Sequence, residues 1–64
     1  MFIKLTLRND KSIWLNVFKV ESIVDQEIYS NVMFRGDDYP VEVKESPEQI
    51  IEMIKEMKKW NFIK

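Results

Sequence analysis

The chain has 64 residues, of which 45% are hydrophobic and 33% charged, and its formal net charge at pH 7 is −1. This length allows one domain with a small core. The sequence contains neither Cys nor His, which excludes disulfides, zinc sites built from thiolate and imidazole, and nucleophiles activated by His.

The N-terminal part of the chain predicts a β-hairpin. Residues 3–8 alternate apolar and polar side chains, which is typical of a half-buried strand. The sequence Asn-Asp-Lys at residues 9–11 predicts a turn, and residues 12–16 predict a second strand. On this second strand, Trp14 falls on the face opposite Ile13 and Leu15.

Asn16 marks a change of period. Residues 17–24 repeat their apolar side chains every three to four positions, which does not fit a continuous strand. Asn is depleted within strands and favoured at turns and caps, where its side-chain oxygen accepts a hydrogen bond from a nearby backbone N–H. We therefore predict a tight turn or one helical turn over residues 16–19 and a third strand over residues 22–28.

Two further strands are predicted over residues 32–35 and 39–45. Gly36 is the only Gly in the chain; it begins the turn between them and is expected to have a positive φ. In the last strand, Tyr39 is expected to face the core. Pro40 has no N–H and is expected at the start or edge of a strand, which leaves the opposite sheet edge to pair with another chain.

The strongest local signal predicts a helix over about residues 47–60. Ser46 and Gln49 have the spacing of a capping box, and Pro47 occupies the favoured first helical position. Apolar side chains recur at helical spacing along this segment, with Trp60 or Asn61 as the next member of the stripe.

Together these elements predict an α+β fold in a single domain, residues 1–64. The predicted architecture is a small antiparallel β-meander of four or five strands within residues 2–45, followed by one C-terminal α-helix packed on one sheet face. No apolar run approaches the roughly 18 residues of a membrane span, so we expect no membrane insertion and a cytoplasmic location. The predicted core consists of Ile3, Leu5, Leu7, Ile13, Leu15, Phe34, Tyr39, Val41, Val43, Ile50, Ile54 and Met57.

Three segments in order, "IKLTLRND", "IWLN…KVESI" and "VEVKES" followed by a helix, resemble the FlbD-like (SwrD) small flagellar and swarming-motility proteins, a family with related phage and bacterial hypothetical proteins. Leu15–Asn16 match the Leu-Asn pair of that family. Val20 and Ile23 match its spaced aliphatic positions, and Glu45–Ser46 match the Glu-Ser before its last helix. The resemblance implies a flagellar or swarming role and brings no catalytic residue with it.

An interaction surface is predicted on the sheet face that the helix leaves uncovered. An apolar cluster on such a face marks a site of association, and Trp is enriched at binding hot spots. The alternative is that a bulge or turn reverses one strand, so that Trp14 belongs to the core. The residues proposed for the surface are Trp14, Phe18, Met33, Arg8 and Arg35.

Nucleic acid is a second possible partner of this face. Basic side chains around an aromatic ring on a sheet are typical of single-strand binding, and Lys4, Arg8, Arg35 and Lys44 are expected on the face of Trp14. The net charge is unfavourable for this function, because residues 21–48 carry eight acidic side chains against Arg35 and Lys44.

The acidic residues do not predict a catalytic or metal site. Asp37 and Asp38 are expected in a turn, and Glu48 in the first turn of the helix, where acids are common for structural reasons. We therefore expect a non-enzymatic protein-interaction or regulatory module with no catalytic residue, no cofactor and no bound metal. By resemblance, its partner is a flagellar or swarming protein. The alternatives are self-association, a phage-encoded protein that binds and modulates a host protein, and a single-stranded nucleic-acid-binding module.

Overall fold

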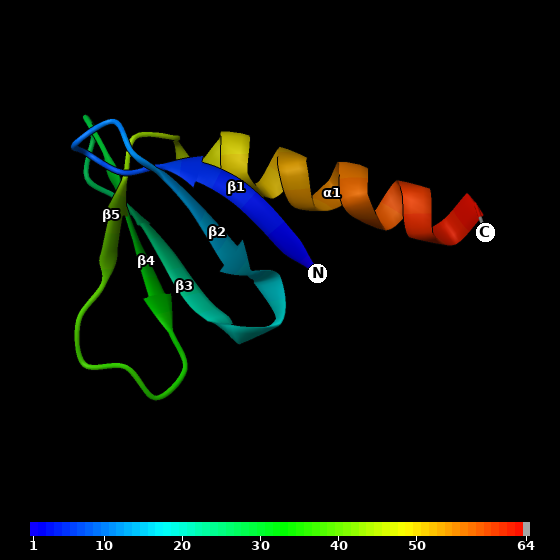
Figure 1. Cartoon of the computed structure of the whole chain (residues 1–64), viewed down its shortest axis with the longest axis horizontal. Helices are drawn as coiled ribbons and strands as arrows, with labels where there is room; N and C mark the ends of the chain where they lie inside the picture. The colour runs from blue at the N-terminus through cyan, green and yellow to red at the C-terminus, as the bar shows by residue number, and fades with distance from the viewer. Residues whose placement is uncertain (64) are drawn as a thin grey trace.

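The computed structural model describes the backbone of residues 1–63 and the side chains of residues 1–58. Five antiparallel strands precede one C-terminal helix in this part of the chain (Figure 1), which confirms the α+β class. In chain order the elements are β1 (Phe2–Thr6), β2 (Ser12–Asn16), the 3₁₀ helix η1 (Val17–Lys19), β3 (Val20–Asp25), β4 (Ser30–Phe34), β5 (Val41–Val43) and α1 (Pro47–Ile63).

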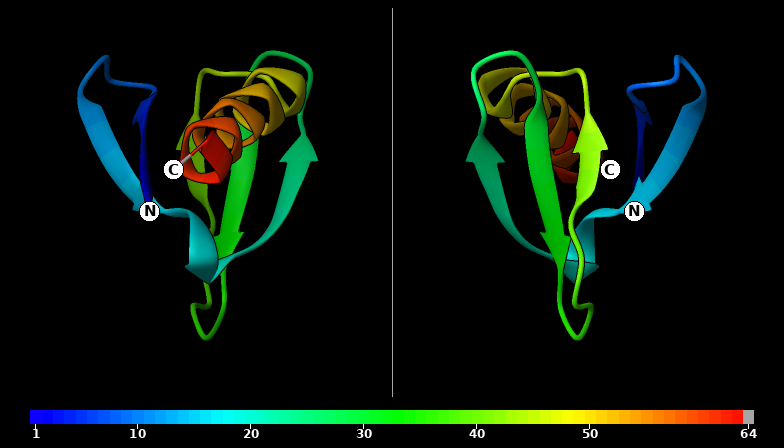
Figure 2. Two further views of the ribbon diagram at one scale, coloured as in Figure 1. Left: turned by 90° about the vertical axis from the view of Figure 1, so that its right-hand side faces the viewer. Right: turned by 90° about the vertical axis from the view of Figure 1, so that its left-hand side faces the viewer.

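The strands divide into two sheets. β1 pairs with β2, and β3, β4 and β5 form a second sheet in that order. Consecutive strands β2 and β3 are unpaired because η1 turns the chain from one sheet into the other. Figure 2 shows the two sheets splayed apart and joined at η1, with α1 seen nearly end-on over the β3–β4–β5 sheet. A bridge between Leu7 and Val43, and a 2.8 Å hydrogen bond from the N–H of Lys44 to the carbonyl of Thr6, join the sheets at their other end.

Asn16 causes the turn between the sheets. Its backbone is extended, and its Oδ1 accepts a hydrogen bond of 3.1 Å from the N–H of Phe18. This contact satisfies one N–H at the start of η1, as expected of a cap residue. The predicted role of Asn16 is therefore confirmed.

The strand boundaries differ from the predicted ones in the middle of the chain. β3 begins at Val20, has a bulge between Val20 and Ser22, and ends at Asp25, so that Ile28 lies in the following turn. β5 begins after Pro40, and residues 36–40 form a loop in which Gly36 has φ 87°. The positive φ of Gly36 is thus confirmed. Tyr39 lies in this loop with 82% of its surface exposed, so its predicted place in the core is wrong.

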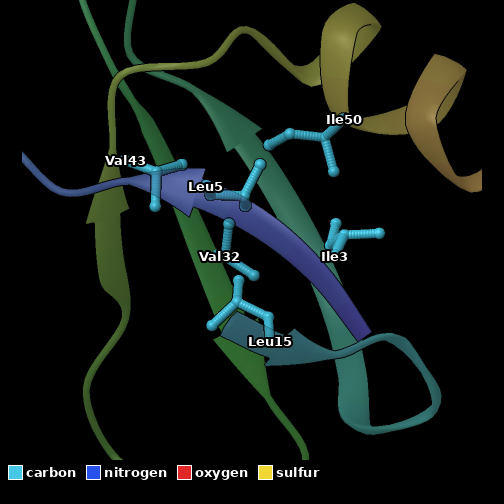
Figure 3. Close-up of a cluster of buried hydrophobic side chains, with 6 residues drawn as sticks. All are labelled: Ile3, Leu5, Leu15, Val32, Val43 and Ile50. Carbon is cyan, nitrogen blue, oxygen red and sulfur yellow. The ribbon is translucent and has the colours of Figure 1, made fainter. Parts of the chain in front are cut away.

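The core lies between the two sheets and the first turns of α1 (Figure 3). Its side chains are at most 4% exposed, and burying an aliphatic side chain of this size contributes about 1.5–3 kcal/mol to folding. The helix therefore completes a core to which both sheets contribute. Among the side chains of residues 1–58, the buried hydrophobic ones are Ile3, Leu5, Leu15, Val32, Val43 and Ile50.

The predicted capping box defines the start of α1. The N–H of Ser46 donates to Oε1 of Gln49 at 2.8 Å, and the N–H of Gln49 donates to Oγ of Ser46 at 3.1 Å. The helix begins at Pro47 as predicted and continues to Ile63, beyond the predicted end at residue 60. The predicted stripe position at Trp60 or Asn61 lies outside the side chains that the structure describes. Within the described residues, no helix is long and apolar enough to cross a membrane.

Glu45, just before this helix, links three parts of the fold. Its Oε1 accepts from the N–H of Thr6 at 2.9 Å, and its Oε2 accepts from the hydroxyl of the same residue at 2.8 Å. Its backbone carbonyl accepts from the hydroxyl of Ser30, a residue with no exposed surface, at 2.7 Å. One residue thus ties the end of β1 and the start of β4 to the entrance of α1.

Candidate interaction surface

Trp14 lies on the outer face of the β1–β2 sheet. Its neighbour Leu15 faces the core, and successive side chains of a strand point to opposite faces. The ring is 63% exposed, which removes the alternative that Trp14 is a core residue. Lys4 is its cross-strand partner on β1, and the ammonium group of Lys4 lies 6.0 Å from the centroid of the ring. This distance is at the limit of a cation–π contact.

A second large aromatic residue, Phe18, stands exposed on η1 close to the end of β2. Phe18 is 65% exposed, and none of the three side chains of η1 is fully buried. Arg35 follows β4, and its Nη2 donates to the carbonyl of Phe18 at 2.9 Å. The backbone N–H of Arg35 also donates to the carbonyl of Lys19 at 2.9 Å. These two bonds hold the end of the second sheet against η1.

Between these elements lies a shallow groove of about 300 Å³, which we call the Trp14 groove. It lies where the end of β2 meets the end of β4, so residues distant in sequence share it. Its lining mixes two aromatic residues, one aliphatic residue, one amide, two cationic side chains and one carboxylate. The lining residues are Trp14, Leu15, Asn16, Lys19, Phe34, Arg35 and Asp37.

Two of the five predicted surface residues, Trp14 and Arg35, line this groove. Phe18 is exposed on η1 and contacts Arg35 through its backbone carbonyl, and the other two residues lie elsewhere. Arg8 is near the β1–β5 junction, where its Nη1 is 3.3 Å from Oε1 of Glu42 and its guanidinium carbon is 4.3 Å from the ring centroid of Tyr29. Met33 is half-buried on the outer face of β4 and pairs in register with Ser22. Five residues on one continuous face were expected from a single sheet. Met33 belongs instead to the β3–β4–β5 sheet, and Arg8 lies at the turn end of the β1–β2 hairpin.

The basic residues proposed for nucleic acid divide in the same way. Lys4 and Arg35 lie beside Trp14, whereas Arg8 and Lys44 are on the far side, in ion pairs with Glu42 and Asp10. The prediction also missed Lys19, which lines the groove. Its position on the turn after Asn16 was the available signal.

The acidic residues are dispersed. Among the residues that the structure describes, no group of three Asp or Glu side chains is arranged to hold a metal ion. Glu45 bonds to Thr6, and Glu42 forms an ion pair with Arg8. Asp37 and Asp38 lie in the exposed loop after β4.

A second and larger groove, of about 640 Å³, was not predicted. We call it the β1–α1 groove, because it runs between the N-terminal half of β1 and one face of the helix. One feature of the sequence could have predicted this groove. Glu52 and Glu56, and likewise Met53 and Met57, are four residues apart and so lie on one face of the helix. The lining residues are Phe2, Ile3, Lys4, Gln49, Glu52, Met53, Glu56 and Met57.

Comparison of the chain with protein-family models, with curated proteins and with solved structures finds no match in any of the three. The function is therefore argued from the surfaces described above and from the resemblance in the sequence.

Proposed function

We propose that this chain is a small non-enzymatic protein-interaction or regulatory module whose partner docks on the Trp14 groove and on Phe18. The observation that carries the proposal is the exposure of Trp14 and Phe18, at 63% and 65%, together with the Arg35 side chain, which lines the Trp14 groove and bonds to the carbonyl of Phe18. Single exposed apolar residues are ordinary. A Trp and an Arg at one groove, with an exposed Phe on the adjoining 3₁₀ helix, have the composition of a binding hot spot.

The proposed partner is a protein of flagellar or swarming function. This part of the proposal rests on the resemblance of the Leu15–Asn16, Val20–Ile23 and Glu45–Ser46 positions to the FlbD-like family. The groove favours an amphipathic partner segment, since its lining combines the Trp14 ring with Arg35 and Asp37. A phage-encoded protein that modulates a host protein is the alternative biological setting for the same surface.

The test is affinity capture by the wild-type chain and by two matched variants. Trp14→Ala removes the exposed ring from the groove, and Tyr39→Ala removes an aromatic ring that is 82% exposed and does not line the groove. We expect a partner, identified by mass spectrometry, to be retained by the wild type and by Tyr39→Ala and lost from Trp14→Ala. Substitution of a hot-spot residue lowers the binding free energy by about 2 kcal/mol or more, which corresponds to at least thirtyfold weaker binding.

Folding and self-association are measured in the same series. Circular dichroism is expected to show equal folding of both variants, because each removed ring is exposed. Sedimentation of the wild type and Trp14→Ala detects a homo-oligomer that uses the groove. A captured protein that binds Trp14→Ala as well as the wild type would contradict the proposal.

Single-stranded nucleic acid is the second candidate partner, because three cationic side chains surround Trp14. Lys4 lies over its ring, and Lys19 and Arg35 line its groove. Stacking of a base on the ring with these cations at the phosphates would bind a short strand. The test is titration with a labelled oligonucleotide of mixed sequence at 50 and 200 mM salt. Binding through three phosphates would weaken roughly eighteenfold between these concentrations, and absence of binding at low salt would reject this candidate.

A further inference from the structure

The N-terminal half of β1 has an unpaired backbone edge. Hydrogen bonds from Val17 to Met1 and from Leu7 to Lys11 place the backbone groups of the odd-numbered residues of β1 toward β2. In an antiparallel pair the alternate residues direct their N–H and C=O groups to the other side. Phe2 and Lys4 are such residues, and neither has a backbone partner on that side among the described residues.

Thr6, the next residue on this edge, shows what a partner supplies there. Its N–H donates to the carboxylate of Glu45, and its carbonyl accepts from the N–H of Lys44. β5 therefore completes the edge of β1 only at this end. Towards Phe2, β1 and β5 diverge, as Figure 1 shows, and the ladder positions of Phe2 and Lys4 remain open.

The open edge borders the β1–α1 groove. Figure 1 shows α1 running alongside β1, and the groove between them has a volume of about 640 Å³, within the range of ligand sites. Met53 and Met57 supply half-buried thioether side chains to its wall. Met side chains adapt to many apolar shapes and are common at surfaces that bind peptides.

The charge along this groove is negative on the helix side. Glu52 and Glu56 are exposed, line the groove, and form no ion pair with a described side chain. Lys4 is the cationic residue of the lining, and its ammonium group extends towards the Trp14 ring on the outer face. A segment that enters the groove thus meets two carboxylates.

We propose that the β1–α1 groove binds an extended segment of a partner protein that adds to the edge of β1 as a further strand. The segment carries apolar side chains at alternate positions, which contact Met53 and Met57, together with Lys or Arg, which pair with Glu52 and Glu56. Its backbone bonds to the N–H and C=O groups of Phe2 and Lys4, as in other cases of strand addition to a sheet edge. This site is separate from the Trp14 groove and does not depend on the function proposed for it.

The probe is the acetylated and amidated hexapeptide KVRVKV, with EVEVEV and an N-methylated KVRVKV as controls. Amide hydrogen exchange of the ¹⁵N-labelled full chain follows Lys4 and Phe2. At saturating KVRVKV we expect exchange at the Lys4 amide to slow at least tenfold, whereas Thr6, already bonded, changes little. EVEVEV and the N-methylated peptide, which lacks ladder donors, are expected to give no protection.

The variant Glu52→Gln/Glu56→Gln tests the charge of the helix side. It is expected to bind KVRVKV roughly two- to thirtyfold more weakly, the range for losing two exposed ion pairs, with an unchanged circular dichroism spectrum. Trp14→Ala is expected to bind the peptide like the wild type; loss of binding there would place the peptide on the other surface and overturn the proposal. Equal binding of EVEVEV or of the N-methylated peptide would overturn it too. Without peptide, the protection of the Lys4 amide from exchange could rise with protein concentration. That result would show that a second copy of this chain binds the edge, and it would refute the proposal of a partner segment.

Discussion

Glu45 gives the sharpest prediction about stability. Glu45→Ala removes the acceptor of two hydrogen bonds, at 2.9 Å from the N–H of Thr6 and 2.8 Å from its hydroxyl. The hydroxyl can rotate to another acceptor, but the half-buried N–H cannot, and an unsatisfied donor costs about 1–3 kcal/mol. We expect the free energy of unfolding to fall by about 2–3 kcal/mol. For a domain of this length the total free energy of unfolding is roughly 3–10 kcal/mol.

The assay is unfolding in urea and by heat, followed by circular dichroism. A loss of 2–3 kcal/mol corresponds to a fall in Tm of roughly 10–20 °C for a domain of this size. The matched control is Glu42→Ala, which removes another acid of the same region. Glu42 is in an exposed 3.3 Å ion pair with Arg8, and such pairs contribute about 0–1 kcal/mol.

Comparison of the two variants decides whether Glu45 links the sheets. Glu45→Gln keeps an oxygen for the N–H of Thr6 and is expected to lose less stability than Glu45→Ala. If Glu45→Ala is no more destabilising than Glu42→Ala, the two hydrogen bonds contribute little, and the argument for this residue as the link between β1 and α1 fails.

Three more substitutions test separate features of the fold, each by urea unfolding. Asn16→Ala removes the acceptor for the Phe18 N–H and is expected to cost about 0.5–2 kcal/mol; Asn16→Asp, which retains an acceptor, should cost less. Gly36→Ala is expected to cost about 1–2 kcal/mol from its φ of 87° alone, because the added Cβ meets nothing within 4 Å; an unchanged stability would contradict this. Val43→Ala empties a site with no exposed surface and is expected to cost about 2–3 kcal/mol, whereas Val24→Ala, at 47% exposure, serves as the control and should stay below 1 kcal/mol.

Features fixed by local chemistry were predictable from the sequence. The capping box of Ser46 and Gln49, the cap formed by Asn16 and the positive φ of Gly36 each depend on residues within three or four positions of one another. The outward face of Trp14 follows from strand alternation, once Asn16 ends the strand where predicted. These contacts need no knowledge of where the rest of the chain lies.

Features fixed by distant contacts were not predictable in this way. The division into two sheets depends on the angle that η1 imposes, and that angle is not encoded in the alternation of the strands. It places Met33 on a different sheet from Trp14 and brings Lys19 to the groove beside Trp14. Tyr39 was assigned to the core because its position alternates with Val41 and Val43. The conformation of Gly36 and the missing N–H of Pro40 instead make residues 36–40 a loop.

The contacts of Glu45 also bear on how the chain folds during its synthesis. Thr6 and Glu45 are 39 positions apart, and the core closes on Ile50. The N-terminal hairpin alone is marginal, as isolated hairpins are in water. Its apolar inner face therefore stays exposed until most of the chain has left the ribosome. Because contacts of long sequence separation also slow folding, we expect nascent chains that end before residue 50 to be protease-sensitive and to be bound by chaperones.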